Sequence, residues 1–324
     1  MLNGTKTWII VALLLMIIGT ALFVAAMTLN DWNFTKLSTR PYITKSHDIT
    51  DTFNNIAINT NTAKIVFVPS EDGVCRVTCT DDEHISYEVV VRDGTLCIDP
   101  MYKKKAWYRY IAISFGQSKI TVELPEAAYG ALIIQKDTGR VEIPADFVFE
   151  SLDVKTNTGD ISILATVSGS LKIHTDTGDI WLEGGTPTSM DLSVSTGDIR
   201  ASRIACSGDV VIKVRTGKAY LTDLTCKNLT TTGSTGDLTL KNVIAEQAFS
   251  ITRSTGDVTL EASDAAEIFI ETDTGDVKGT LLSPKIFLPK TSTGKIRVPT
   301  TTGGGRCEIT TSTGNIRIEI AQLT

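Results

Sequence analysis

Three Asp-Thr-Gly triplets are the feature of this sequence closest to a catalytic motif. They are Asp137-Thr138-Gly139, Asp176-Thr177-Gly178 and Asp273-Thr274-Gly275. In aspartic proteases two such aspartates share a proton across a cleft. Here the triplets belong to a repeating pattern, and the aspartate position is filled in the other repeats by Asn157, Ser195, Arg215, Ser234, Ser254, Ser292 and Ser312. An acid that varies in this way between repeats does not predict a protease.

A second group of carboxylates directly follows the glycines of the same pattern. Stacked carboxylates about 5 Å apart repel each other by roughly 1 kcal/mol even in water, so such a column needs relief. Calcium is one source of relief, but calcium-binding repeats carry Gly-Gly-x-Gly-x-Asp turns that this chain lacks. The other source is the basic residues that interrupt the series, such as Arg140 and Lys218. We therefore expect a solvated ladder of turns, with calcium as the alternative, for which the candidate ligands are Asp160, Asp179, Asp198, Asp237, Asp257 and Asp276.

One short segment combines basic and aromatic side chains. Such a cluster can contact lipid head groups or an anionic wall polymer. It can equally be the tip of a hairpin with solvated lysines, and the sequence leaves both interpretations open. The candidate contact residues are Lys103, Lys104, Lys105, Trp107, Tyr108 and Arg109.

The sequence predicts no metal centre, no cofactor and no nucleic-acid partner. The six cysteines form no Cys-x-x-Cys pair and the three histidines are isolated, whereas a zinc site needs clustered ligands. We interpret the cysteines as buried free thiols that act as small hydrophobic residues. The net charge of −6 is also opposite to the basic patch that nucleic acid requires.

Residues 8–29 form an uncharged apolar run. At about 1.5 Å per residue, this run is long enough to cross a bilayer. A signal peptide with a cleavage site near Val24 to Ala26 is the alternative, but its apolar region is usually only about 7–15 residues long. We therefore expect an uncleaved membrane anchor. The positive-inside rule does not predict that the rest of the chain lies outside, since Lys36, Arg40 and Lys45 follow the run and only Lys6 precedes it.

The elements that carry these residues follow from an internal repeat. Ten Thr-Gly pairs recur every 19 or 20 residues, with glycines at Gly139, Gly159, Gly178, Gly197, Gly217, Gly236, Gly256, Gly275, Gly294 and Gly314. On both sides of each pair, apolar residues alternate with polar ones, as in a strand with one buried face. Glycine allows the tight turn between the two strands. A repeat of this length is one coil of a β-solenoid, so we predict an all-β solenoid with this inner ladder: Leu132, Leu152, Leu171, Met190, Val210, Leu229, Phe249, Ile268, Phe287 and Cys307.

The repeat also predicts how the chain is divided. Residues 56–67 match one degenerate coil with Ala63 in the glycine position, and Asp93-Gly94 is typical of a hairpin turn. We expect a short tail over 1–7, the anchor over 8–29, an irregular stalk over 30–52, a degenerate coil and β cap over 53–130, and ten repeats over 131–324. Arg253 occupies a Thr/Val column, where we expect its side chain to reach the surface past Gly233. The last coil would form a free edge able to support a weak homodimer.

These features together resemble a known bacterial family. The anchor, the Trp32-Asn33-Phe34 stretch, the Ile65-Val66-Phe67-Val68-Pro69 strand and the serial Thr-Gly-Asp turns are similar to the β-strand-repeat family of unknown function labelled "putative adhesin". Coverage extends over nearly the whole chain. The resemblance implies a β-solenoid, a Gram-positive type of membrane anchoring and an extracytoplasmic repeat domain. It supplies no catalytic residues.

From these observations we expect a non-catalytic cell-surface module for adhesion or scaffolding, attached to the cell membrane. A polysaccharide-active β-helix enzyme is one alternative, but it needs converging carboxylates in a groove, and no repeat carries a distinctive acid pair. An envelope-stress signalling accessory is the other alternative. The sequence does not separate it from adhesion.

Overall fold

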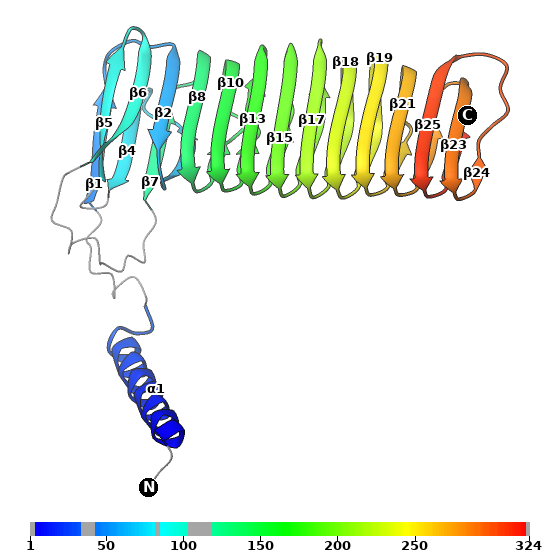
Figure 1. Cartoon of the computed structure of the whole chain (residues 1–324). Coiled ribbons are helices and arrows are strands. Elements are labelled where there is room, and N and C mark those ends of the chain that lie inside the picture. Colours follow the sequence, from blue (N-terminus) through cyan, green and yellow to red (C-terminus); the bar gives the residue numbers. More distant parts are fainter. Residues whose placement is uncertain (1–3, 34–42, 82–84, 103–117, 322–324) are drawn as a thin grey trace.

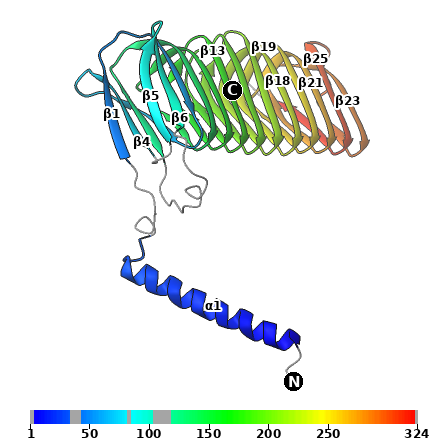
Figure 2. The ribbon, with the colours of Figure 1, turned by 60° about the vertical axis from the view of Figure 1, so that its left-hand side comes forward.

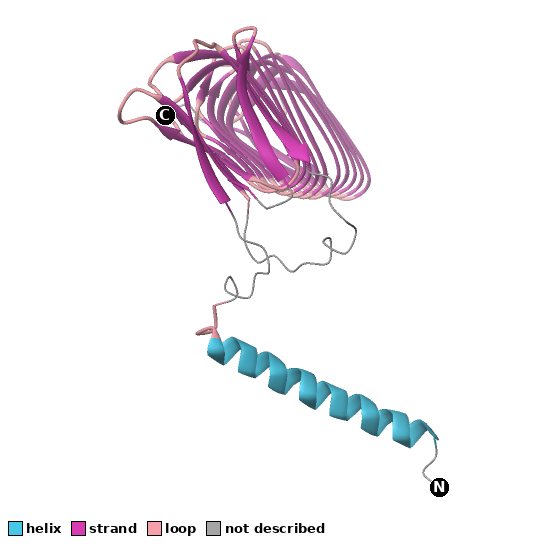
Figure 3. Cartoon of the chain, turned by 90° about the vertical axis from the view of Figure 1, so that its left-hand side faces the viewer, coloured by secondary structure: helices cyan, strands magenta, loops and turns pink. Residues whose placement is uncertain are grey.

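The computed structural model describes residues 4–33, 43–81, 85–102 and 118–321. They form one helix, α1 (Gly4–Leu29), and 26 strands (Figure 1; Figure 3). Within α1, Lys6–Leu29 is long and apolar enough to cross a membrane, with a mean hydropathy of 2.9. A signal sequence near the N-terminus would meet the same criterion.

The repeats form a β-solenoid, which confirms the predicted fold class (Figure 2). Each coil has a longer strand before its Thr-Gly turn and a shorter strand after it. The strands before the turns are β8 (Ala128–Thr138), β10 (Val148–Thr158), β13 (Ser170–Thr177), β15 (Ser189–Thr196), β17 (Asp209–Thr216), β21 (Asp264–Thr274), β23 (Lys285–Thr293) and β25 (Gly305–Thr313). Those after the turns are β9 (Val141–Ile143), β11 (Ile161–Ile163), β14 (Ile180–Glu183), β16 (Ile199–Ala205), β20 (Val258–Glu261), β22 (Val277–Leu281), β24 (Ile296–Arg297) and β26 (Ile316–Ile320). Two strands, β18 (Ala219–Thr235) and β19 (Leu238–Thr255), run from one turn to the next, and β12 (Thr166–Val167) is a short extra strand.

Neighbouring coils pair in parallel with equivalent residues aligned. Leu152 lies opposite both Leu132 and Leu171, and the same alignment continues through Met190 and Val210. The inward residues of these strands are almost completely buried and merge into one hydrophobic core. Because a strand reverses its side chains every residue, the alternating sequence pattern fixes this register.

The N-terminal part closes one end of the solenoid. The degenerate coil consists of β2 (Asn55–Thr60) and β3 (Lys64–Pro69), which pair in parallel with β8 and β9. Outside it lie β4 (Cys75–Asp81), β6 (Thr95–Tyr102), which forms a hairpin with β5 (Ile85–Arg92), and β7 (Lys119–Leu124). One expectation was wrong in part: β1 (Ile43–Ile49), placed within an irregular stalk, is a strand that pairs antiparallel with β4. Its partner strand was not evident from the polar sequence.

The coils at the opposite end do not follow the order of the sequence. Strand β25 pairs with β21 on one side and with β23 on the other, and β26 likewise lies between β22 and β24. In Figure 1 the red strand β25 therefore lies inside the orange strand β23. Along the stack, the inner ladder therefore ends in the order Ile268, Cys307, Phe287, and the predicted order Ile268, Phe287, Cys307 was wrong. The expectation that the last coil of the sequence forms the free edge was therefore wrong, and with it the basis of the expected homodimer.

Proline explains which coil occupies the edge. Pro289 lies in β23, and a strand that contains proline lacks one backbone donor and is found almost exclusively at sheet edges. Strand β25 contains no proline and can pair on both sides. The C-terminal coil is therefore the better internal neighbour for β21.

The hydrophobic core lies entirely between Ile49 and Ile318 and includes no residue of α1. All strand pairs of the described chain also lie between residues 43 and 320. A protein that comprises residues 43–324 therefore retains the complete core and all of this pairing.

Candidate functional site

The Thr-Gly turns form one straight edge of the solenoid. Gly236, in the middle of the stack, has a φ of 122°, a conformation that side chains rarely adopt. A Cβ atom on Gly236 would also overlap with the backbone carbonyl of Gly217 in the preceding coil. Glycine is therefore required here both for the turn and for the close approach of successive coils.

The acidic residues after these glycines form a hydrogen-bonded ladder. The Oδ1 atom of Asp179 accepts the backbone N–H of Asp198 at 2.8 Å, and Oδ1 of Asp257 accepts the N–H of Asp276 at 2.9 Å. Asp160, Asp198, Asp237 and Asp276 bond in the same way to the following coil. We call these six aspartates the acidic turn column. Each carboxylate satisfies a backbone donor that the glycine turn leaves unpaired, and this role was not anticipated from the sequence.

Basic residues relieve the remaining repulsion within the column. Asp160 pairs with Arg140 at 2.8 Å, and Asp237 pairs with Lys218 at 3.0 Å. The pKa of Asp160 is lowered, chiefly by the backbone N–H of Asp179, and that of Asp237 is lowered chiefly by its hydrogen bond with Lys218. Arg200, outside the column, adds an ion pair to Asp198 at 2.8 Å. Arg140 and Lys218, two of the basic residues that were expected to interrupt the column, therefore contact its aspartates directly.

The column has the geometry of a structural ladder. Among the residues that the structure describes, no group of three or more His, Cys, Asp or Glu side chains is arranged to hold a metal ion. Calcium stays the alternative for this column, and a stabilisation specific to calcium would distinguish the two interpretations. The other candidate contact residues, Lys103–Lys105, Trp107, Tyr108 and Arg109, lie outside the described residues.

A buried column of polar side chains runs just inside the turns. The hydroxyl of Thr175 donates to the carbonyl of Gly159 at 3.3 Å, and Thr311 donates to Gly275 at 3.2 Å. In the first coil, Lys136 takes the same place and donates to the carbonyl of Ala63 at 2.6 Å. Burial lowers the pKa of Lys136 to about 8. We call this series the threonine column; its threonines and Lys136 bond to the turn of an adjacent coil, while Val194, Val214 and Gly233 fill the same column without a polar side chain.

Arg253 also belongs to the threonine column, but its polar group makes no bond to a turn. Its side chain is 1% exposed, and none of its three guanidinium nitrogens has a hydrogen-bond partner. Gly233 in the preceding coil leaves the space that Nη1 occupies, as the sequence predicted. The expectation that Arg253 reaches the surface was wrong, because the strands on both sides cover it. Burial lowers its pKa to about 10.

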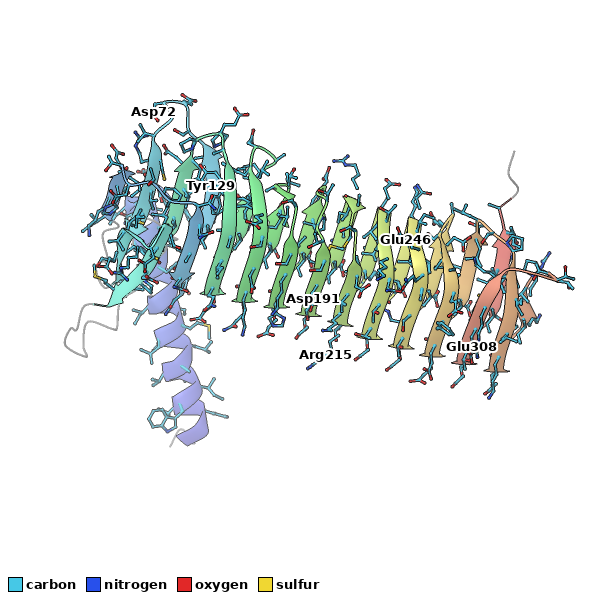
Figure 4. The ribbon with its side chains drawn as sticks, turned by 90° about the horizontal axis from the view of Figure 1, so that it is seen from above. Asp72, Tyr129, Asp191, Arg215, Glu246 and Glu308 are labelled. Atoms are coloured by element: carbon cyan, nitrogen blue, oxygen red, sulfur yellow. The ribbon has the colours of Figure 1, made fainter. Side chains whose placement is uncertain are left out.

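The outward faces carry a changing set of side chains on a constant frame. Trp181, Arg200 and Tyr220 lie side by side on β14, β16 and β18, and the Arg200 guanidinium lies 5.3 Å from the centre of the Tyr220 ring. On the other face, side chains project all along the stack, from Asp191 near its middle to Glu308 near its free end (Figure 4). These positions can vary without any change in the core.

Comparison with known proteins gives the family but no activity. The Toastrack DUF4097 family matches residues 53–213 and 201–324. None of the curated proteins compared with the chain matches it.

Three solved structures are similar at low identity. A "putative adhesin" from Parabacteroides distasonis is 12% identical, with 87% of this chain and 98% of that chain covered and a TM-score of 0.46. A protein described as lipid binding from the same organism is 13% identical, with 73% and 94% covered and a TM-score of 0.43. Another adhesin-like protein, from Bacteroides fragilis, is 15% identical, with 87% and 97% covered and a TM-score of 0.37. Similarities at this level add nothing to an argument about function.

Proposed function

Because the chain belongs to the Toastrack DUF4097 family of β-strand repeats, we propose that it is a membrane-anchored, non-catalytic surface module that recognises a partner along its solenoid. The main support is the contrast between its faces. Most inward positions are apolar, and the polar ones are confined mainly to the column beside the turns, whereas the outward positions aligned on neighbouring coils change from Asp153 to Lys172 to Asp191. A rigid frame with a variable outer surface is the arrangement by which solenoid proteins bind partners.

The ladder supports a non-catalytic role for the most conspicuous acids. A glycosidase needs two carboxylates with different roles on opposite sides of a bond. In the acidic turn column each carboxylate does the same thing, which is to accept a backbone N–H from the next coil. These aspartates are therefore structural groups in this proposal.

The proposed anchor is α1. Its length and apolar composition suit a bilayer, and the solenoid core is complete without it. In this proposal the helix holds the protein at the cell membrane and the repeat domain lies outside the cytoplasm.

Protease treatment of intact cells tests this arrangement. A C-terminal epitope on the full chain should be lost when protease is added to intact cells, while a cytoplasmic marker is preserved. Alkaline extraction should leave the full-length chain in the membrane fraction, and Leu14→Arg should release it or reduce its amount. Protection of the epitope until lysis would contradict the external placement. A shortened chain in the soluble fraction would contradict the anchor.

A further inference from the structure

The free end of the solenoid has a charge opposite to that of the rest of the chain. Residues 277–324 contain seven Lys or Arg and two Asp or Glu, a net charge of +5. Since the whole chain carries −6, residues 1–276 carry −11. The acidic turn column ends at the same place, where Asp276 is followed in space by Asn315 and then Lys295.

The cations of this end are arranged in adjacent coils. Arg317 lies between Lys278 and Arg297, about 4.8 Å from each along the stack. Together with Lys295 they line a groove of about 720 Å³. Arg317 is paired with Glu319 at 2.8 Å, and Asp276 is the acidic residue in the groove wall. The groove is therefore predominantly positive.

Apolar side chains are exposed on both walls of the last coil. Ile286, Leu288 and Ile296 are 49%, 47% and 46% exposed. Ile296 belongs to an inward column and is bare because no coil covers it. Ile286 and Leu288, however, lie opposite Arg306 and Glu308, on the outward face of the wall across from the groove, where the core does not require an apolar residue.

Protection of the edge does not explain this composition. Proline and lysine are common at sheet edges because they prevent unwanted strand pairing, which accounts for Pro289 and Lys290. Two aliphatic side chains on the outward face work against that protection. Contact with a second copy of the same end would bring two positive surfaces together.

We propose that this end docks onto an anionic phospholipid surface. We define the basic tip as the two rims of the last coil, which meet the surface together when the solenoid docks end-on: Ile286, Leu288 and Lys290 on β23, and Lys295, Ile296 and Arg297 at the turn and on β24. Its cations bind the head-group phosphates, and its three aliphatic side chains enter the interfacial layer, the combination that holds amphipathic surfaces at anionic membranes. A soluble polyanion would be bound by the cations but would leave the aliphatic side chains in water.

The inference rests on the proposed function only for the presence of a nearby membrane. Binding by the tip is a property of the solenoid and can be measured without α1. The two proposals can therefore fail independently.

Vesicle flotation with residues 43–324 tests the tip. The protein should float with vesicles of phosphatidylcholine and phosphatidylglycerol and remain at the bottom with phosphatidylcholine alone. The triple variant Lys290→Glu, Lys295→Glu, Arg297→Glu should bind at least about a hundredfold more weakly, since each cation near an anionic surface contributes about a factor of five to the binding constant. The matched control, Lys155→Glu, Lys172→Glu, Lys227→Glu, makes the same charge change on other coils and should bind like the original protein.

A second variant separates the lipid surface from other polyanions. Ile286→Ser with Leu288→Ser should weaken flotation but leave binding to soluble polyphosphate unchanged. Flotation that is unaffected by the serine variant, or equal for the triple variant and its control, would overturn the proposal, as would equal binding to neutral vesicles. If the solenoid floats but alkaline extraction removes the full chain from membranes, the proposed anchor is contradicted and docking by the basic tip is supported.

Discussion

Replacing Arg253 with methionine is expected to stabilise the solenoid. Arg253 places a guanidinium group inside the core with no hydrogen-bond partner on any of its three nitrogens. Methionine keeps most of the aliphatic stem and removes the charge. Replacement of buried ionic groups by apolar ones of similar size is often stabilising.

The expected gain follows from the lowered pKa. Burial lowers the pKa of Arg253 from 12.5 to about 10, which corresponds to a penalty of about 3 kcal/mol while both the folded and the unfolded chain are protonated. The smaller methionine leaves unfilled space that costs about 1 kcal/mol. The net expectation is a stabilisation of about 2 kcal/mol at pH 7. Since the folded pKa is below the unfolded one, the penalty is complete below about pH 10 and disappears as the pH rises through 10 and beyond.

Urea unfolding of residues 43–324 measures this effect. Arg253→Met should raise the midpoint at pH 7 without changing the slope, and the difference from the original protein should shrink at pH 11. Arg215→Met is the matched control, because Arg215 is exposed at the turn edge (Figure 4), and it should change stability by less than about 0.5 kcal/mol. A lower midpoint for Arg253→Met would refute the reasoning, since it would mean that the guanidinium has a stabilising partner in the native protein.

Three further predictions concern the turn edge. Gly236→Ala should destabilise the solenoid by at least about 3 kcal/mol, because it combines a strained φ with overlap on Gly217. The control Gly73→Ala has a φ of 74° but open space around it, so it should cost only about 1 kcal/mol. Equal losses in thermal unfolding would contradict the close approach of successive coils at Gly236. Asp237→Asn should cost about 0.5–1 kcal/mol at pH 7 by removing the pair with Lys218. Because the folded pKa of Asp237 is lowered, this loss should be present above about pH 4 and vanish as the pH falls through the folded pKa. A loss that does not decrease as the pH falls below 4 would exclude the ion pair as its cause. Calcium should shift the melting temperature no more than magnesium at equal ionic strength, and a saturable shift specific to calcium would make the acidic turn column a metal site.

Most of the fold could be predicted because the repeat is directly visible in the amino-acid sequence. The interval between Thr-Gly pairs sets the coil length, and the alternation of residues such as Leu171 and Ile173 sets the register. The details of the turns were less accessible. That Asp179 bonds to the next backbone N–H depends on where the coils meet in space, which a list of aspartates does not show.

A second turn column was missed for a different reason. Six residues after successive turn glycines, Arg203, Asp223, Asn242 and Ala262 have φ values between 46° and 56°. Asp and Asn tolerate this conformation and could have indicated the turn. Arginine and alanine at the equivalent positions hid it, because neither residue type is typical of a left-handed conformation.

The order of the last two coils has a cause that also shapes the tip. Phe287 and Cys307 can each continue the inner ladder after Ile268, so the core itself does not decide between the two orders. The loop over residues 298–304, which returns the chain, adds little to the entropic cost of folding, since the cost of closing a loop grows only slowly with its length. What differs is the backbone: an internal strand needs N–H groups directed to both neighbours, an edge strand only to one, and Pro289 lacks an N–H. The coil that carries Pro289 is therefore displaced to the edge, and its lysines and outward aliphatic side chains are displaced with it, to the one surface of the solenoid that no other coil covers.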